Sequence, residues 1–198
     1  MTLSEKQSAP YSLLGELAQM KTTEPPPLHL WHPEHVSDID IEVKADGTWY
    51  HEGVPIKRQR LVRLFSTVMR LELDGHYYLV TPVEKCRIRV AQAPFVAILM
   101  SVVGSGEAQV LRFTTNVADQ VSADVEHPIT VEQAPDGTLV PFVEVRDGLR
   151  ARLARSVYYQ LMDLLTIEQV DSEAWYGVWS SGAFFAIQRA TEVEDHDA

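Results

Sequence analysis

The sequence predicts an α+β protein built by internal duplication, with two mainly antiparallel sheet domains that each carry one main helix. Three pairs of similar segments predict it, and they occur in the same order along the chain. The pairs are IDIEVKADGT at 39–48 with ITVEQAPDGT at 129–138, RLVR at 60–63 with RLAR at 152–155, and YYLVT at 77–81 with WYGVW at 175–179. The offset starts at ninety residues and drifts upward by a few, as small loop insertions after a duplication would produce.

The composition is that of a folded chain, since 198 residues with 45% hydrophobic content can bury one sizeable core or two small ones. The formal net charge of −11 repels polyanions at long range and disfavours nucleic-acid binding. Cys86, the only cysteine, excludes an internal disulfide framework and a multi-cysteine zinc site. A reducing compartment follows, and we predict a cytoplasmic protein.

No secretory signal or membrane span is expected. The N-terminal segment has no basic region followed by a continuous apolar stretch. The longest apolar run, from 96 to 103, covers about eight residues, where a membrane-spanning helix needs about twenty. The sequence therefore predicts a soluble chain.

The chain divides into four expected parts. Residues 1–30 form an N-terminal helical arm and a Pro-rich linker, because prolines 25–27 cannot continue a helix. Residues 31–93 form the first repeat domain and residues 94–190 the second. Residues 191–198 form an acidic tail.

In the first repeat, Ile39, Ile41 and Val43 alternate with charged residues, which is the period of a half-buried strand. Asp46-Gly47 supplies a hairpin turn, since glycine adopts the positive φ that such turns require. Apolar residues then recur every three or four positions and predict an amphipathic helix over 58–70. A second Asp-Gly turn leads into a strand at 77–81.

The second repeat opens with a long hairpin, in which 94–103 and 108–114 are joined by Gly104-Ser105-Gly106. The turn is not a dinucleotide fingerprint, because a strand follows it where a phosphate-binding helix would be needed. Further along, apolar residues from Leu149 to Leu164 predict a helix over about 147–165.

Motifs for the common chemistries are absent. The chain has no G-x-x-x-x-G-K-[ST], no G-x-S-x-G and no H-E-x-x-H. A metal site is not expected, because Pro33 interrupts the cluster of His29, His32, Glu34 and His35. Cys86 alternates with charged neighbours, which predicts that it lies on the buried face of a strand. We therefore expect its side chain to act as a small hydrophobic group in the core and not as a reactive thiol.

Arginines concentrate in or beside the two predicted helices although the chain is acidic overall. They are Arg58, Arg60, Arg63 and Arg70 in the first repeat, and Arg146, Arg150, Arg152 and Arg155 in the second. If these segments converge, their guanidinium groups would hold an anionic ligand by forked hydrogen bonds. The alternative is ordinary solvation, with the arginine heads paired to some of the abundant carboxylates.

Longer motifs resemble one known family. They include SDIDI at 37–41, DGTW at 46–49, YYLVTPVEK at 77–85, RDGL at 146–149 and VWSSGAFF at 178–185. This pattern resembles the bacterial family called domain of unknown function 1285. The resemblance implies an internal duplication, a second domain similar to pleckstrin-homology-like folds, a nucleotide-type ligand between the domains, and a role in signalling.

We expect a cytoplasmic regulatory module of signal transduction that binds a small anionic or nucleotide-like ligand between its two domains. The candidate ligand-binding residues are Arg58, Arg63, Thr81, Glu84, Lys85, Arg146, Arg155, Tyr158 and Trp179. The basic side chains would neutralise the ligand, and Trp179 or Tyr158 would stack on a base. Two alternatives stay open: a protein-interaction or dimerisation domain without a small ligand, and an enzyme in which Glu84 and Lys85 act as an acid and base pair.

Overall fold

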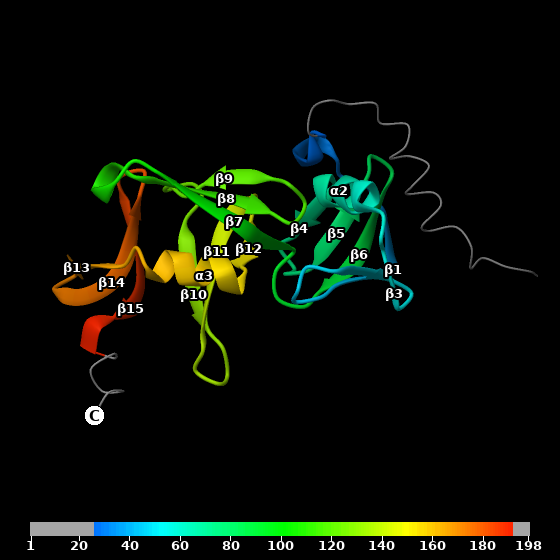
Figure 1. Ribbon diagram of the computed structural model, residues 1–198. Helices are drawn as coiled ribbons and strands as arrows, with labels where there is room; N and C mark the ends of the chain where they lie inside the picture. The colour runs from blue at the N-terminus through cyan, green and yellow to red at the C-terminus, as the bar shows by residue number, and fades with distance from the viewer. Residues whose placement is uncertain (1–25, 192–198) are drawn as a thin grey trace, which may run out of the picture. The chain divides into compact units, whose positions relative to one another are not determined.

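The computed structural model describes residues 26–191, and the chain divides between Gln92 and Ala93 into two compact units. Unit 1 denotes the described residues up to Gln92, and unit 2 those from Ala93 onward. Each unit contains a six-stranded sheet, and unit 2 also has a three-stranded sheet (Figure 1). The predicted α+β class with two sheet-bearing units is confirmed. Most of the predicted N-terminal arm and nearly all of the acidic tail lie outside the described residues.

The sheet of unit 1 has the strand order β3-β2-β1-β6-β5-β4. Its strands are β1 (His35–Val43), β2 (Trp49–His51), β3 (Val54–Pro55), β4 (Met69–Leu71), β5 (Tyr77–Val80) and β6 (Glu84–Val90). Neighbouring strands are antiparallel except β1 and β6, which are parallel. A short 3₁₀ turn, η1 (Leu28–Leu30), precedes β1.

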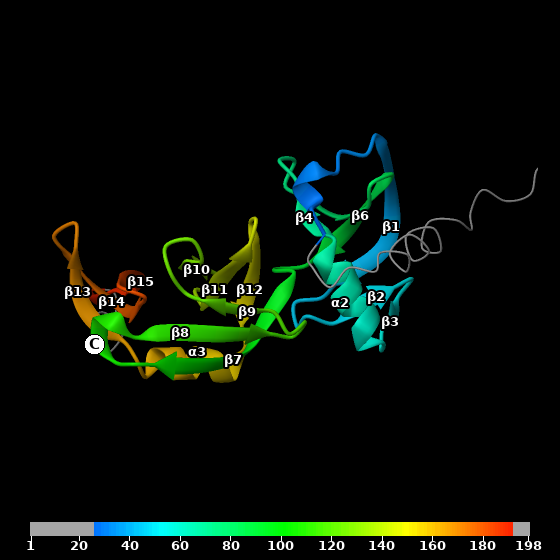
Figure 2. The ribbon, with the colours of Figure 1, turned by 90° about the horizontal axis from the view of Figure 1, so that it is seen from above.

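Helix α2 (Gln59–Thr67) packs on this sheet through its apolar side, next to β2 and β3 (Figure 2). The Phe65 ring stacks on Trp49 of β2, with the ring centroids 6.1 Å apart. Ile41 and Val43 are buried, so the alternation predicted for β1 is confirmed. Cys86 is fully buried on β6, as its alternation with charged residues predicted.

The predicted extent of the first helix, 58–70, is too long. Helix α2 ends at Thr67, and Met69 already pairs with Leu79 in the sheet. The hydroxyls of Ser66 and Thr67 donate to the carbonyls of Arg63 and Leu64 and so compete with helical hydrogen bonding at this end. The buried apolar residues after the helix fit the pattern of a strand as well as that of another helical turn, so the sequence pattern alone did not locate the end of the helix.

The larger sheet of unit 2 has the order β10-β11-β12-β7-β8-β9. Its strands are β7 (Phe95–Val103), β8 (Val110–Thr115), β9 (Gln120–Ser122), β10 (Ile129–Gln133), β11 (Leu139–Arg146) and β12 (Leu149–Leu153). Strands β7 and β12 are parallel, and the other neighbours are antiparallel. The predicted hairpin over Gly104–Gly106 is confirmed, with a 3₁₀ turn, η2 (Gly106–Ala108), at its tip.

The predicted helix over 147–165 is wrong in its first half. Leu149, Ala151 and Leu153 are buried while Arg150 and Arg152 between them are not, and this period of two belongs to strand β12. The strand pairs with β11 on one side and β7 on the other. Only Arg155–Met162 is helical, as α3. The long-range sheet partners decide the conformation that local periodicity left ambiguous.

A small sheet completes unit 2, with the order β13-β14-β15. Its strands are β13 (Thr166–Val170), β14 (Glu173–Ser180) and β15 (Ala183–Arg189). Figures 1 and 2 both show the η2 end of the β7–β8 hairpin beside this sheet. The buried hydroxyl of Ser180 holds the two together, because it donates to the Ala123 carbonyl and accepts from the Leu111 amide.

The two larger sheets share one topology. Each consists of two three-stranded meanders, and the first strand of the first meander runs parallel to the last strand of the second. Strands β1 to β6 therefore correspond to β7 to β12, and the Asp74-Gly75 turn corresponds to Asp136-Gly137.

The repeat register inferred from the sequence, which matched β1 with β10, is therefore wrong. Both matched segments are a half-buried strand followed by an Asp-Gly turn, a pattern that any tight hairpin favours. The helices are not counterparts either, because α2 lies between the two meanders of unit 1 whereas α3 follows the second meander of unit 2. The similarity between 77–81 and 175–179 does not mark counterparts either, because β14 belongs to the separate small sheet and β5 to the larger sheet of unit 1.

Candidate functional site

Charged side chains on one face of the unit 1 sheet pair with one another across strands. Lys85, Arg87 and Arg89 alternate along β6 and therefore point to the same face. The ion pairs are Lys85 with Glu72 at 3.4 Å, Arg87 with Asp38 at 2.6 Å and Arg89 with Asp40 at 2.5 Å. This face is largely neutralised by its own carboxylates.

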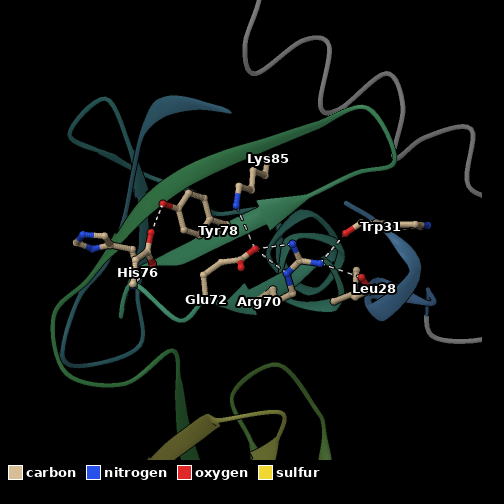
Figure 3. A network of polar contacts seen from close by, with 8 residues as sticks. Leu28, Trp31, Arg70, Glu72, His76, Tyr78 and Lys85 are labelled. Carbon is tan, nitrogen blue, oxygen red and sulfur yellow. Dashed lines mark hydrogen bonds and ion pairs between the residues drawn. The ribbon is translucent and has the colours of Figure 1, made fainter. Parts of the chain in front are cut away.

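Arg70 on β4 connects these ion pairs to the segment that enters the unit (Figure 3). Its Nη2 lies 2.5 Å from Oε1 of Glu72. Its Nη1 donates to the carbonyl of Leu28 at 2.9 Å and to that of Trp31 at 2.8 Å. Burial acts to raise the pKa of Glu72, but the hydrogen bonds and charges of Arg70 and Lys85 outweigh burial and hold the pKa below its usual value.

Lys85, a predicted ligand-binding residue, is part of this structural network. Its Nζ also lies 4.8 Å from the centroid of the Tyr78 ring (Figure 3). The Tyr78 hydroxyl donates to Oδ2 of Asp74 at 2.8 Å, which raises the pKa of Tyr78. A backbone hydrogen bond from His76, followed by the one from Tyr78, lowers the pKa of Asp74. An anion that recruited Lys85 would compete with Glu72.

Thr81 and Glu84, also predicted for the site, shape the turn into β6. The Thr81 hydroxyl accepts from the Glu84 amide and donates to the Glu84 carbonyl, at 3.1 Å each. Both side chains are buried. Glu84 and Lys85 are adjacent on a strand and so point to opposite faces, which does not support the acid and base pair considered for an enzyme.

Arg60 and Arg63 are exposed residues of α2, and Lys57 and Arg58 directly precede its first residue. We call these four residues the basic α2 surface. All four are exposed, and no carboxylate forms an ion pair with them among residues 26–191. The segment 53–71 has no Asp or Glu at all. Arg58 is the N-cap of α2, and its side chain forms no capping hydrogen bond.

The predicted residues of unit 2 lie on three different elements. Arg146, at the end of β11, forms an ion pair with Asp119 and lies 5.0 Å from the Phe95 ring centroid. Arg155 begins α3, and its Nη2 donates to the Tyr159 hydroxyl at 3.1 Å. Tyr158, also on α3, has its ring 5.8 Å from that of Tyr159. Trp179 on β14 donates from Nε1 to a carboxylate oxygen of Glu168 at 3.1 Å.

Arg58 and Arg63 thus belong to one element, Arg58 as the N-cap of α2 and Arg63 in its second turn, and Arg155 and Tyr158 both lie on α3. Sequence reasoning left Lys57 and Arg60 out of the site, although the acid-free run around them was a usable signal. It also missed a groove of about 430 Å³ on unit 2, lined by Arg112 and several hydroxyl-bearing residues. A groove of about 510 Å³ on unit 1 contains Arg87 and Asp38, which already pair with each other.

Comparison with known proteins decides the family. The model of "Domain of unknown function (DUF1285), N-terminal domain" matches residues 26–93. The model of "Protein of unknown function (DUF1285), C-terminal domain" matches residues 94–187. The chain belongs to the DUF1285 family.

Two crystal structures of DUF1285 proteins are similar to it. One, from Silicibacter pomeroyi DSS-3, has 46% identity and a TM-score of 0.84, covering 92% of this chain and 97% of that one. The other, from Shewanella baltica OS155, has 22% identity and a TM-score of 0.51, covering 63% of this chain and 91% of that one, and shows the fold alone. No curated protein matches the chain.

Two findings within the described part of the chain complete the description of this DUF1285 protein. None of its helices there is long and apolar enough to cross a membrane. Between residues 26 and 191, no three side chains of His, Cys, Asp or Glu gather closely enough to hold a metal ion.

Proposed function

We propose that this protein is a regulatory module in signal transduction that binds a small phosphorylated, nucleotide-like anion on the basic α2 surface. The observation that carries the proposal is the contrast between two groups of cations in unit 1. Lys85, Arg87 and Arg89 have carboxylate partners, whereas Arg58 and Arg63 have none among the described residues. The unpaired group has guanidinium hydrogen-bond donors that a phosphate can occupy without breaking an existing ion pair.

The position of these cations at the start of α2 adds a second argument. A helix N-terminus carries a partial positive charge, and cations beside it are unfavourable by a few tenths of a kcal/mol to about 1 kcal/mol each. Lys57, Arg58 and Arg60 all lie there, and the first turn contains no acidic residue. A bound phosphate would reverse this repulsion, because it would contact both the helix end and the arginines.

The other predicted residues enter the proposal with different weight. Arg155 and Tyr158 belong to unit 2, where Arg155 already contacts the ring and the hydroxyl of Tyr159, so the proposal for α2 does not use them. Lys85 would have to exchange Glu72 for the ligand, and Arg146 of unit 2 already pairs with Asp119. Thr81 and Glu84 support the fold of the β5–β6 turn, and Trp179 of unit 2 already donates to Glu168.

A thermal-shift screen of the full chain against nucleotides, dinucleotides and phosphorylated metabolites at fixed salt tests the proposal. A ligand present at about one hundred times its dissociation constant should stabilise the fold by about 2.7 kcal/mol. The double variant Arg58→Gln, Arg63→Gln should lose that shift. Its matched control is Arg87→Gln, Arg89→Gln, which removes the same charge from paired arginines and should retain the shift. Equal loss in both variants would refute a site on α2.

A protein-interaction function is the second candidate, and strand β7 favours it. Ile98 and Val102 lie on one face of β7 and Leu99 and Val103 on the other, and all four aliphatic side chains are between 41% and 62% exposed. Clustered exposed apolar residues commonly mark a protein-binding surface. A silent ligand screen, together with a molecular mass by light scattering that rises with concentration, would favour this function over ligand binding.

A further inference from the structure

A polar groove of about 430 Å³ lies on one face of the β7–β8–β9 ribbon in unit 2. The strand register places Arg112 of β8 directly between Ser101 of β7 and Ser122 of β9. Directly opposed residues in antiparallel strands have Cβ atoms about 5 Å apart, so both hydroxyls lie next to the arginine. The neighbouring row adds Thr114 opposite Gln120.

The charge in this groove is uncompensated. None of its lining residues is acidic, and Arg112 has no ion pair among residues 26–191. On the corresponding sheet of unit 1, in contrast, Arg87 and Arg89 each pair with an aspartate from the adjacent strand. In a chain with 28 acidic residues, the groove surrounds Arg112 with hydroxyls and an amide and with no carboxylate, a lack of acidic neighbours that it shares with the basic α2 surface.

The polar side chains are suited to one oxyanion. A guanidinium group presents two parallel N–H donors to a carboxylate, and the hydroxyls of Ser101 and Ser122 can each donate one more hydrogen bond to it. A single arginine in a strongly acidic chain favours a monoanion over a polyphosphate.

An apolar wall adjoins the polar groove. Side chains two apart on a strand share a face, so Leu99 and Val103 flank Ser101 on the same side of β7. Leu99 is 62% exposed and Val103 47%. A ligand with an aliphatic body would cover both side chains while its charged head contacts Arg112.

We infer that this groove is a binding site for a small organic carboxylate, with Arg112, Ser101 and Ser122 holding the carboxylate and Leu99 and Val103 contacting the aliphatic part. The inference is independent of the basic α2 surface. It concerns other residues, another unit and a different class of ligand.

The test is a titration of the full chain with hexanoate, followed by backbone amide chemical shifts, with the uncharged hexanamide and with acetate as comparisons. Hexanoate should produce saturable shifts centred on Ser101, Arg112 and Ser122. Hexanamide should bind about tenfold or more weakly because it lacks the charge-assisted pair, and acetate should bind more weakly than hexanoate because it lacks the chain.

Two variants test whether hexanoate binds in this groove. Arg112→Gln should weaken hexanoate binding about tenfold or more. Arg87→Gln, an exposed arginine on the unit 1 sheet, should leave it unchanged. Absence of hexanoate binding would overturn the inference, as would equal binding by Arg112→Gln and the unaltered chain, or shifts centred elsewhere. Those outcomes would make Arg112 an ordinary hydrated side chain.

Discussion

At the scale of single residues, two positions are expected to tolerate substitution poorly because of the atoms that surround their side chains. Gly177 on β14 is one, because a Cβ atom there would lie 2.4 Å from the Phe184 ring and 2.4 Å from the Phe185 carbonyl oxygen. Glu72 is another, since its carboxylate contacts Arg70 and Lys85 at once. Each position yields a stability prediction with a direct physical cause.

Gly177→Ala should destabilise unit 2 by about 3 kcal/mol, at the upper end of overpacking costs, because the clashing carbonyl belongs to the paired strand and cannot rotate away. Urea unfolding followed by circular dichroism measures the change. The control is Gly182→Asn, where φ is +76° but the space around the missing Cβ is open. Asparagine tolerates this conformation, so the control should cost less than about 1 kcal/mol. Equal costs would contradict the steric explanation.

Glu72→Gln should lower the stability of unit 1 by about 1–2 kcal/mol at neutral pH, because charge-assisted hydrogen bonds to Arg70 and Lys85 are lost. The folded state lowers the pKa of Glu72 below its usual 4.5. The stabilisation is therefore fully present above about pH 4.5 and is lost as the pH falls through the folded-state pKa.

The stability difference between Glu72→Gln and the unaltered chain should accordingly shrink in acid. Denaturant unfolding at several pH values between 3 and 7 provides the measurement. Glu34→Gln, which alters an exposed carboxylate, is the control and should change stability little. A difference that stays constant across this pH range would show that charge is not its source.

At the scale of elements, α2 is built for packing on one side and is poorly capped at its start. Val62 and Phe65 are buried on its inner side. Arg58 occupies the N-cap, where Ser, Thr, Asp and Asn are preferred because their short side chains accept hydrogen bonds from the first helical amides. A residue that suits the helix poorly at an exposed position is consistent with a role other than stability.

Arg58→Asp should therefore stabilise the protein by about 1 kcal/mol, since the carboxylate can cap the helix and complement its dipole. The same substitution should abolish the thermal shift produced by a phosphorylated ligand, if the basic α2 surface binds one. Differential scanning calorimetry with and without ligand measures both effects. Arg58→Gln removes the charge without adding a good cap and should leave stability nearly unchanged. A destabilised Arg58→Asp variant would mean that Arg58 already supports the fold.

At the scale of the whole molecule, two features stand out: a topology used twice and an uneven distribution of charge. The larger sheets of the two units share their strand order and their single parallel pair. The net charge is −11, yet segment 53–71 carries five cations and no acid, and segment 91–106 carries no charge at all. These local compositions are the basis of the proposals made above, an anion for the first segment and a protein partner for the second.

The sequence by itself determined much of the local structure. Alternation of apolar and charged residues identified β1 and the buried position of Cys86, and Asp-Gly pairs identified the hairpin turns at 46–47 and 74–75. These features depend on side-chain period and on backbone conformations that neighbours in the chain control. The concentration of arginines around α2 was also evident, because composition alone reveals it.

Only the tertiary structure decided the repeat register, the boundary between β12 and α3, and which arginines are paired. Each depends on partners distant in sequence: β7 beside β12, Asp38 beside Arg87, Asp119 beside Arg146. A short apolar run satisfies a helix or a strand until a sheet supplies hydrogen bonds for its backbone. In the same way, an arginine in a sequence is equally a ligand contact or half of an ion pair until the fold places a carboxylate next to it.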